Sequence, residues 1–261
     1  MNYAFFKKKK ILIVGITNIF SISWGIAKVM YKFGAELAFV YKRKKLKNRI
    51  QNFAKTLNSN IVLQCNINSD TEIKILSRKL YQHWKKFDGI IHAVAYVPLS
   101  QLQENYLQIA NRQDFLATHE SCSFSLVALV KELYPLLNEN SSIVTLSYLG
   151  SIKYIPFYHV IGPAKASLEA NVRYLAYCVG KKNIRINAVS SGPIKTSSSY
   201  KIPFFKKIFS LYKSYSPLKK NTTSKEIGNV TSFLCSDLAS GITGQIIYVD
   251  SGFSISNMFP S

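Results

Sequence analysis

Cysteine is scarce in this sequence, and its few copies stand far apart. Of 261 residues only four are cysteine, and no two of them form a C-x-x-C pair. This spacing gives no metal site and predicts reduced thiols. The four histidines have no metal-ligand spacing either. We therefore expect a protein without bound metal, whose free thiols are Cys65, Cys122, Cys178 and Cys235.

Long hydrophobic runs are also missing. No apolar run approaches the roughly 20 residues that a membrane-spanning helix needs. Near the N-terminus the apolar run ILIVGI (11–16) follows several lysines, as in a secretory signal. It is only about six residues long, however, and no small-residue cleavage site follows it. We interpret it as a buried strand and expect a cytoplasmic protein without a membrane partner.

Acidic residues are few. The chain has 13 Asp and Glu against 34 Lys and Arg, a formal net charge of +21. Such a charge can attract nucleic acid, an anionic membrane or an acidic protein. It can also follow from compositional drift, because the chain is rich in Lys, Asn, Ile, Tyr and Phe together, whose codons are rich in A and T. The basic clusters at 7–10, 41–45 and 204–207 make no single stripe with stacking aromatics, which favours drift and predicts no nucleic-acid partner.

What the sequence does have is a regular alternation of apolar runs and helical patterns. Several runs are continuous and β-branched, as in strands buried on both faces. Their alternation predicts an α/β fold, a doubly wound parallel seven-stranded sheet of the Rossmann-like type, in a single domain over 1–261. The predicted strands are 11–16, 36–41, 60–65, 89–95, 142–148, 184–190 and 245–250, and the predicted helices include 22–33, 70–86, 111–137, 164–180 and 224–236.

The segment 192–222 interrupts this alternation. It is rich in Ser, Lys and aromatic residues and is too long for a plain connection. It follows the sixth predicted strand, on the carboxyl side of the sheet, where open α/β sheets bind ligands. We predict that this segment is a substrate-binding lid.

A glycine at the end of the first predicted strand suggests a dinucleotide. Gly15 precedes a predicted helix, although Ser21 stands where a middle glycine would be expected and the motif is not G-x-G-x-x-G. A glycine there lets the backbone approach a pyrophosphate, and the helix N-terminus offers N–H donors. After the second strand, Lys42 and Arg43 stand where NAD-specific sites tend to have an acid. Cations suit a 2′-phosphate, so NADPH is conceivable.

Tyr158 stands seven residues before Lys165. Seven residues are about two helical turns, so both side chains could reach one ligand if the tyrosine lies just ahead of the helix. On the spacing alone, a core aromatic and a solvated lysine are the favoured interpretation.

Longer motifs make the chain similar to a known family. They are TLSYLG (145–150), KASLEANVRYLA (165–176), SSGPIKT (190–196), FLCSDLASGITG (233–244) and VDSGFSI (249–255). With them, from about residue 8 to about residue 258, the chain resembles bacterial enoyl-acyl-carrier-protein reductases of the FabI type, a divergent branch of the short-chain dehydrogenase/reductase superfamily. Commoner members place the tyrosine four residues before the lysine. That position is Ile161 here, which cannot donate a proton, so the resemblance favours enoyl reduction over ketone reduction.

The resemblance implies a reaction and its catalytic residues. The reaction is reduction of the trans-2 double bond of an acyl thioester, the last step of the fatty-acid elongation cycle. Tyr158 matches the family's active-site tyrosine, whose hydroxyl hydrogen-bonds the thioester oxygen on which negative charge develops. Lys165 matches the lysine that holds the nicotinamide ribose. Tyr148 matches a second tyrosine of the substrate pocket, which Ala95 and Tyr158 also line.

The resemblance also implies cofactor and partners. NADH is the expected cofactor, with NADPH conceivable, and a homotetramer is the expected assembly. Lys206 and Lys207 match basic residues that the family presents to the acidic acyl carrier protein. Cofactor contacts match Gly15, Ser21 and Ile22 at the pyrophosphate, Lys42 at the adenosine ribose, Asn66 and Ile67 at the adenine, Val94 at the ribose side, and Lys165, Ile194 and Thr196 at the nicotinamide.

The chain departs from the family pattern at several positions. Asn66 replaces an aspartate, and an amide can still pair with adenine. Ala95 replaces a glycine beside the inhibitor pocket, which predicts weaker binding of diphenyl-ether inhibitors such as triclosan. Because proline is tolerated only in a helix's first turn, Pro163 predicts a helix start near 161. We interpret His159 as a bystander. A different short-chain oxidoreductase and a basic surface-binding protein on the same scaffold remain alternatives.

Overall fold

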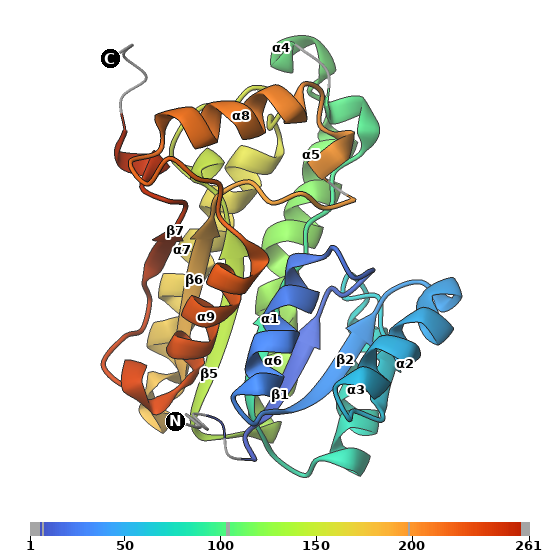
Figure 1. Ribbon diagram of the computed structural model, residues 1–261. Coiled ribbons are helices and arrows are strands. Elements are labelled where there is room, and N and C mark those ends of the chain that lie inside the picture. The colour runs from blue at the N-terminus through green and yellow to red at the C-terminus, as the bar shows by residue number, and fades with distance from the viewer. Residues whose placement is uncertain (1–5, 7, 103–104, 198, 257–261) are drawn as a thin grey trace.

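A computed structural model describes residue 6 and residues 8–102, 105–197 and 199–256 (Figure 1). Within these residues, seven parallel strands form one sheet in the order β3-β2-β1-β4-β5-β6-β7. The predicted doubly wound parallel sheet is therefore confirmed. The strands are β1 (Lys10–Val14), β2 (Glu36–Tyr41), β3 (Ile61–Gln64), β4 (Phe87–His92), β5 (Leu137–Ser147), β6 (Arg185–Ser191) and β7 (Ile246–Val249).

The strands are buried on both faces because helices cover both. In β1, Leu12 and Val14 enter one apolar core, whereas Ile11 and Ile13 enter the other, as the two-residue period of a strand requires. Figure 1 shows α1 and α9 together in front of the sheet. The first core is covered by α3 (Asp70–His83), α6 (Ser125–Leu133) and α7 (Ile161–Val179), and the second by α1 (Ile22–Lys32), α2 (Lys47–Thr56) and α9 (Ser224–Cys235).

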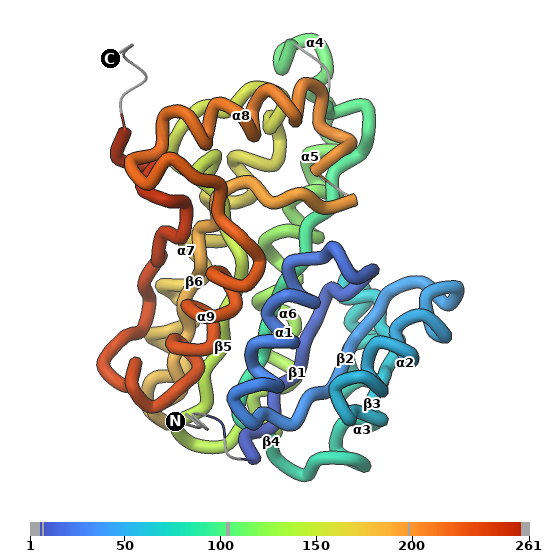
Figure 2. The backbone as a smooth tube through the Cα atoms, viewed as in Figure 1, coloured from blue at the N-terminus to red at the C-terminus, as the bar shows by residue number. Residues whose placement is uncertain are grey.

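The order of the strands reverses at β1. The chain builds outward from β1 to β3, returns to place β4 on the other side of β1, and continues to β7 (Figure 2). Such a reversal leaves a crevice outside the carboxyl ends of β1 and β4. Because all the strands are parallel, the segments that follow them meet at this same edge.

The carboxyl edge is covered by the segment 192–222. It contains α8 (Phe205–Tyr215), which lies beyond the strand ends together with α4 (Tyr106–Ile109) and α5 (Arg112–His119) (Figure 1). Phe205 and Tyr212 of α8 are buried, and Tyr212 belongs to an apolar cluster with Leu149 and Phe253. Through Tyr212, α8 is therefore packed against the residues that follow β5 and β7.

The helices differ in part from those predicted. The predicted helical stretch over 111–137 is confirmed except at its end, because α5, a π-helical turn at Glu120–Phe124 and α6 follow one another without a break, whereas Leu137 already begins β5. Neither α2 nor α8 was predicted as a helix. The start of α7 at Ile161, with Pro163 in its first turn, confirms the proline-based prediction. In the described part of the chain, no helix is both long and apolar enough to cross a bilayer.

Candidate active site

The turn after β1 has the geometry of a pyrophosphate site. Gly15 has a left-handed backbone, with φ at 101°. A Cβ there would lie 2.2 Å from the carbonyl oxygen of Ala93 and 3.1 Å from Val94, so this turn requires glycine. Ser21 is the N-cap of α1 and, among the described residues, makes no side-chain cap hydrogen bond. The uncapped first turn at Ile22 leaves N–H donors and the positive end of the helix dipole for a phosphate, so these residues fit a dinucleotide.

The residues that follow β2, β3 and β4 lie at the same edge of the sheet as this turn, because all the strands are parallel. Lys42 follows β2, and its Nζ lies 5.9 Å from the ring centroid of Tyr96, which follows β4. Since β2 and β4 both neighbour β1, this contact passes over the end of β1. Asn66 and Ile67 follow β3, where Ile67 is buried and Asn66 Oδ1 accepts the N–H of Asn68 at 3.3 Å. The predicted adenosine contacts thus lie along one side of the crevice.

The segment after β6 approaches the same crevice. Ile194 packs against the second apolar core, and Thr196 Oγ1 accepts the N–H of Ser199 at 3.0 Å. Asn18, in the turn after β1, donates from Nδ2 to Ser197 Oγ at 3.1 Å. This hydrogen bond joins the predicted pyrophosphate turn to the predicted nicotinamide segment.

Tyr158 lies just before α7 and rests on a glycine. Its carbonyl oxygen accepts the N–H of Ile161 at 2.9 Å and of Gly162 at 3.3 Å, which ties the residue to the first turn of the helix. A Cβ on Gly150 would lie 2.4 Å from Cδ1 of Tyr158. Burial raises the pKa of the Tyr158 hydroxyl well above its usual value, and the group is therefore protonated and able to donate at neutral pH.

Lys165 of α7 is buried, with 4% of its surface exposed. Its Nζ donates to the carbonyl oxygen of Leu146, near the end of β5, at 2.8 Å. Burial lowers the pKa of Lys165, while Cys122 and Glu169 act in the opposite direction. The same two residues also influence the pKa of Tyr158, so both side chains face one buried region. An ammonium has three N–H donors, and ribose hydroxyls suit those not directed at Leu146.

Tyr148 completes a cluster of aromatic hydroxyls. It follows β5, and its ring meets that of Tyr158 edge to face, with 4.8 Å between centroids and 63° between planes. Its hydroxyl lies 2.7 Å from the hydroxyl of Tyr212. Burial raises the pKa of Tyr148 to about 12. The end of β5 and the start of α7 thus bring Tyr148, Tyr158 and Lys165 together beside the crevice.

Comparisons with known proteins agree on one family. The sequence profile of the family described as "Enoyl-(Acyl carrier protein) reductase" matches residues 15–254. "Enoyl-[acyl-carrier-protein] reductase [NADH] FabI" of Buchnera aphidicola subsp. Schizaphis graminum is 49% identical over 252 residues, which cover 97% of each chain. Its namesake in Escherichia coli K12 is 43% identical over 255 residues, covering 98% of this chain and 97% of its own. The chain belongs to the enoyl-(acyl carrier protein) reductase family.

Solved structures of similar proteins have the same fold. The enoyl-[acyl-carrier-protein] reductase (NADH) of Aquifex aeolicus VF5 superimposes with a TM-score of 0.95 at 39% identity, covering 98% of this reductase and all (100%) of that chain. The reductase of Anaplasma phagocytophilum, solved in complex with NAD, gives a TM-score of 0.92 at 34% identity, covering 97% of this chain and 95% of its own. The predicted family, reductase class and fold are therefore confirmed.

The reductase also holds a buried histidine that the sequence did not assign to the site. Nδ1 of His92 lies 2.8 Å from Thr145 Oγ1, and Nε2 lies 2.9 Å from Ser125 Oγ. Burial and the nearby Lys165 lower the pKa of His92 to about 3, so the ring is neutral. The Ser125 hydroxyl also donates to the carbonyl oxygen of Ser121 at 2.7 Å, and the Thr145 hydroxyl to the carbonyl oxygen of His92 at 3.2 Å. His92 thus joins β4, β5 and α6 beneath the lysine.

Tyr212 and Glu169 were also missed. Tyr212 lies in the segment predicted as a lid, and an apolar spacing of three and four residues from Phe205 through Ile208 to Tyr212 could have indicated a helix there. Glu169 is buried four residues after Lys165 and accepts the hydroxyl of Ser147. Because charged side chains usually lie on the surface, nothing in the sequence predicted that Glu169 is buried.

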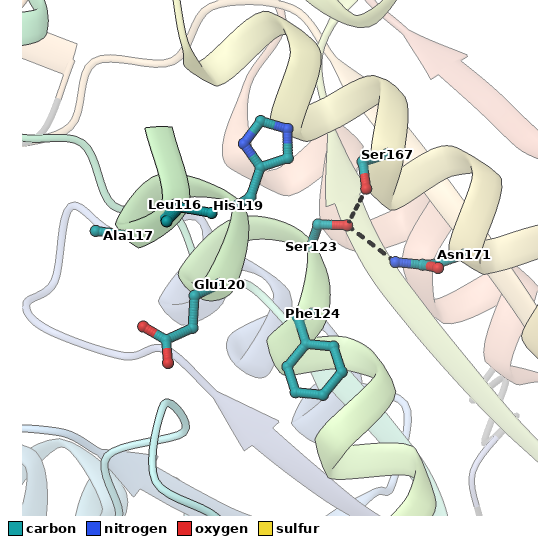
Figure 3. A pocket seen from close by; sticks show the side chains of 8 residues that line it. All are labelled: Leu116, Ala117, His119, Glu120, Ser123, Phe124, Ser167 and Asn171. Atoms are coloured by element: carbon teal, nitrogen blue, oxygen red, sulfur yellow. Dashed lines mark hydrogen bonds between the residues drawn. The ribbon is translucent and has the colours of Figure 1, made fainter. Parts of the chain in front are cut away.

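A hollow on the outer side of α5–α7 contains none of the predicted site residues. Figure 3 shows Ser123 between Ser167 and Asn171, with Ser123 Oγ lying 2.8 Å from Ser167 Oγ and accepting from Asn171 at 2.9 Å. Phe124 and Leu116 line it and are largely exposed. Among the described residues, no group of His, Cys, Asp and Glu could hold a metal ion.

Proposed function

We propose that this chain reduces the trans-2 double bond of enoyl thioesters borne on acyl carrier protein, with NADH as the reductant. NADH, when bound, supplies the hydride that adds to the β-carbon. The observation that supports this most directly is the pairing of Tyr158 and Tyr148 beside the buried Lys165, at the mouth of a dinucleotide crevice. The names of the relatives, which specify NADH and acyl carrier protein, support it further.

Tyr158 is the group that stabilises the developing charge. Hydride addition moves negative charge to the thioester oxygen, and a protonated phenol directed at that oxygen stabilises the enolate. The raised pKa of Tyr158 supports this role because it keeps the proton on the hydroxyl. Tyr148, whose ring edge contacts Tyr158, holds the adjacent wall of the substrate pocket, with Ala95 exposed at its rim.

Lys165 orients the nicotinamide ribose. Its ammonium is already held at Leu146 by one hydrogen bond, and the buried charge needs further acceptors. The other contacts that we assign to the cofactor are Gly15, Ser21 and Ile22 for the pyrophosphate, Lys42, Asn66 and Ile67 for the adenosine, and Val94, Ile194 and Thr196 for the nicotinamide half.

The reaction is tested by the initial rate of NADH oxidation with a trans-2-enoyl thioester on acyl carrier protein. We expect turnover, and we expect none with the corresponding 3-ketoacyl thioester, because Ile161 occupies the position of the ketone-reducing tyrosine. Folded protein that reduces only the ketone would be a different short-chain oxidoreductase. Salt-sensitive DNA binding without NADH binding would favour the surface-binding alternative.

We assign the docking of acyl carrier protein to Lys206 and Lys207. Both are exposed on α8, at the carboxyl edge where the substrate enters. Reversing both charges to Glu should raise KM for the carrier-borne substrate about tenfold and leave KM for NADH within about twofold, because rim charges mainly steer association. The matched control reverses the exposed Lys74 and Lys79 of α3. Equal effects of the two pairs would rule out a specific docking role.

We also propose a homotetramer that works in the cytoplasm. The outer faces of α5–α7 expose Leu116 at 59%, Phe124 at 55%, Tyr174 at 77% and Tyr177 at 90%, and exposed apolar surface of this kind marks sites where subunits can meet. Light scattering should give four times the chain mass, and Phe124→Glu should lower it. A monomeric wild type would exclude the assembly.

A further inference from the structure

A third tyrosine, Tyr212 of α8, touches the candidate active site. Its hydroxyl lies 2.7 Å from that of Tyr148, although the two residues are 64 positions apart. Their ring centroids are 6.4 Å apart with 23° between planes. Tyr148 in turn meets Tyr158 at 4.8 Å. Tyr148 therefore stands between the proposed charge-stabilising residue and a residue of the covering helix.

The position of Tyr212 is fixed by packing. Only 4% of its surface is exposed, and its ring stacks on Phe253 with 3.6 Å between centroids and 17° between planes. Ile208, Tyr215 and Leu149 belong to the same cluster. A buried phenol needs a hydrogen-bond partner for its hydroxyl, and Tyr148 provides one. The stack thus directs the Tyr212 hydroxyl at one atom, Oη of Tyr148.

Both phenols are protonated at neutral pH. Burial raises the pKa of Tyr148 and of Tyr212, and the carboxylate of Asp250 acts in the same direction on each. That carboxylate is itself held in place, because it accepts the N–H groups of Gly252 at 2.9 Å and Ser254 at 2.8 Å. Two phenols have two protons, and one hydrogen bond between them uses one. When Tyr212 donates, the proton of Tyr148 is free for the substrate.

We propose that Tyr212 is a positioning residue of the active site, which donates to Tyr148 and thereby aims the Tyr148 hydroxyl at the substrate thioester. Accepting a hydrogen bond also makes the Tyr148 hydroxyl a stronger donor. Since Tyr212 belongs to α8, the Tyr148 hydroxyl is correctly oriented only when this helix is packed in place. The expected effect on turnover rests on the proposed function, whereas the contact between Tyr212 and Tyr148 is independent of it.

The test is a double-mutant cycle on turnover. Tyr212→Phe keeps the ring and its stack on Phe253 and removes only the hydroxyl, so it should lower kcat about three- to tenfold while KM for NADH stays within about twofold. On a Tyr148→Phe background the same change should cost less than about twofold, because the group through which it acts is gone. Tyr215→Phe, on the same helix, should match the wild type. All rates are measured below each variant's Tm.

Two kinetic results would overturn the proposal. One is a Tyr212→Phe enzyme as active as the wild type; the other is an equal loss on both backgrounds, which indicates packing alone. A readout independent of turnover is the NMR resonance of isotopically labelled tyrosine Cζ. The Tyr148 signal, assigned by its loss in Tyr148→Phe, should move in Tyr212→Phe and stay in Tyr215→Phe. An unmoved signal refutes the contact, whereas an inactive wild type with a moving signal refutes only the proposed function.

Discussion

The ring of Tyr158 lies directly against Gly150, where a Cβ would approach its Cδ1 to 2.4 Å. Gly150 also adjoins α7, since a Cβ on Gly162 would lie 2.8 Å from the carbonyl oxygen of Gly150. The first turn of the helix and the ring of Tyr158 therefore both pack against one small residue. The absence of a side chain at Gly150 sets the position of the Tyr158 hydroxyl relative to the crevice.

Gly150→Ala should displace the Tyr158 ring and slow catalysis. A misplacement of about 1 Å can cost about a hundredfold, so we expect kcat to fall between tenfold and a hundredfold. Overpacking should also lower the free energy of unfolding by about 1–3 kcal/mol. Steady-state kinetics and urea denaturation measure the two effects. Gly180→Ala is the matched control, because nothing lies within 4 Å of a Cβ there. An unchanged kcat in Gly150→Ala would mean that the ring is free to move.

Tyr158→Phe should remove the donor and keep the ring. We expect kcat to fall about a hundredfold, the usual loss for one donor to a developing oxyanion, with the dissociation constant for NADH within about twofold. Rapid-mixing kinetics of the hydride step and fluorescence titration with NADH measure these. Tyr154→Phe serves as control, since Tyr154 is 76% exposed. Normal turnover by Tyr158→Phe would remove the residue from its assigned role.

The strands followed from the sequence because a strand covered on both faces leaves a continuous apolar run. The run 11–16 predicts β1 nearly as it is, and β1 ends at Val14 because Gly15 turns the backbone to positive φ. By contrast, α2 is mostly polar and buries only Ile50 and Ala54. So narrow an apolar stripe gives a weak helical signal.

The sequence could predict those parts of the candidate site that are formed by residues close together in the chain. Tyr158 and Lys165 share the start of α7, and their spacing and the motifs around them were visible in the sequence. The Tyr148–Tyr212 hydrogen bond joins residues 64 positions apart, and no local pattern gives such a contact. The burial of His92 and Glu169 likewise depends on partners from several elements. Long-range polar contacts are fixed by packing, which periodicity does not describe.

His92 should make the fold sensitive to acid. Its pKa is about 3 in the folded chain against about 6.5 when unfolded, so the unfolded state binds the proton first as pH falls. The contribution of His92 to the free energy of unfolding has its full value above the pKa of the unfolded state. It is lost as pH falls toward the pKa of the folded state. The loss approaches about 1.4 kcal/mol per pH unit below about pH 6. Urea denaturation of His92→Gln between about pH 5 and about pH 7 should give a shallower slope than the wild type. The exposed His83→Gln should keep the wild-type slope, and identical slopes in all three proteins would contradict the assignment.

Lys42 and Arg43 should govern how well the enzyme accepts NADPH. They are exposed at the end of β2, and Lys42 is placed over the ring of Tyr96 beside the proposed adenosine site. A 2′-phosphate there would make charge-assisted hydrogen bonds that NADH cannot make. Changing both residues to Ala should therefore lower kcat/KM for NADPH about tenfold more than the value for NADH, which loses only the contact of Lys42 with the adenosine. The control changes Lys44 and Lys45 together to Ala. These two residues carry the same charge as Lys42 and Arg43 and directly follow them in the chain. If both pairs of substitutions lower kcat/KM for NADPH equally, the overall positive charge of the protein is responsible. If only the Lys42 and Arg43 pair lowers it, these two residues of the basic chain help to select the cofactor.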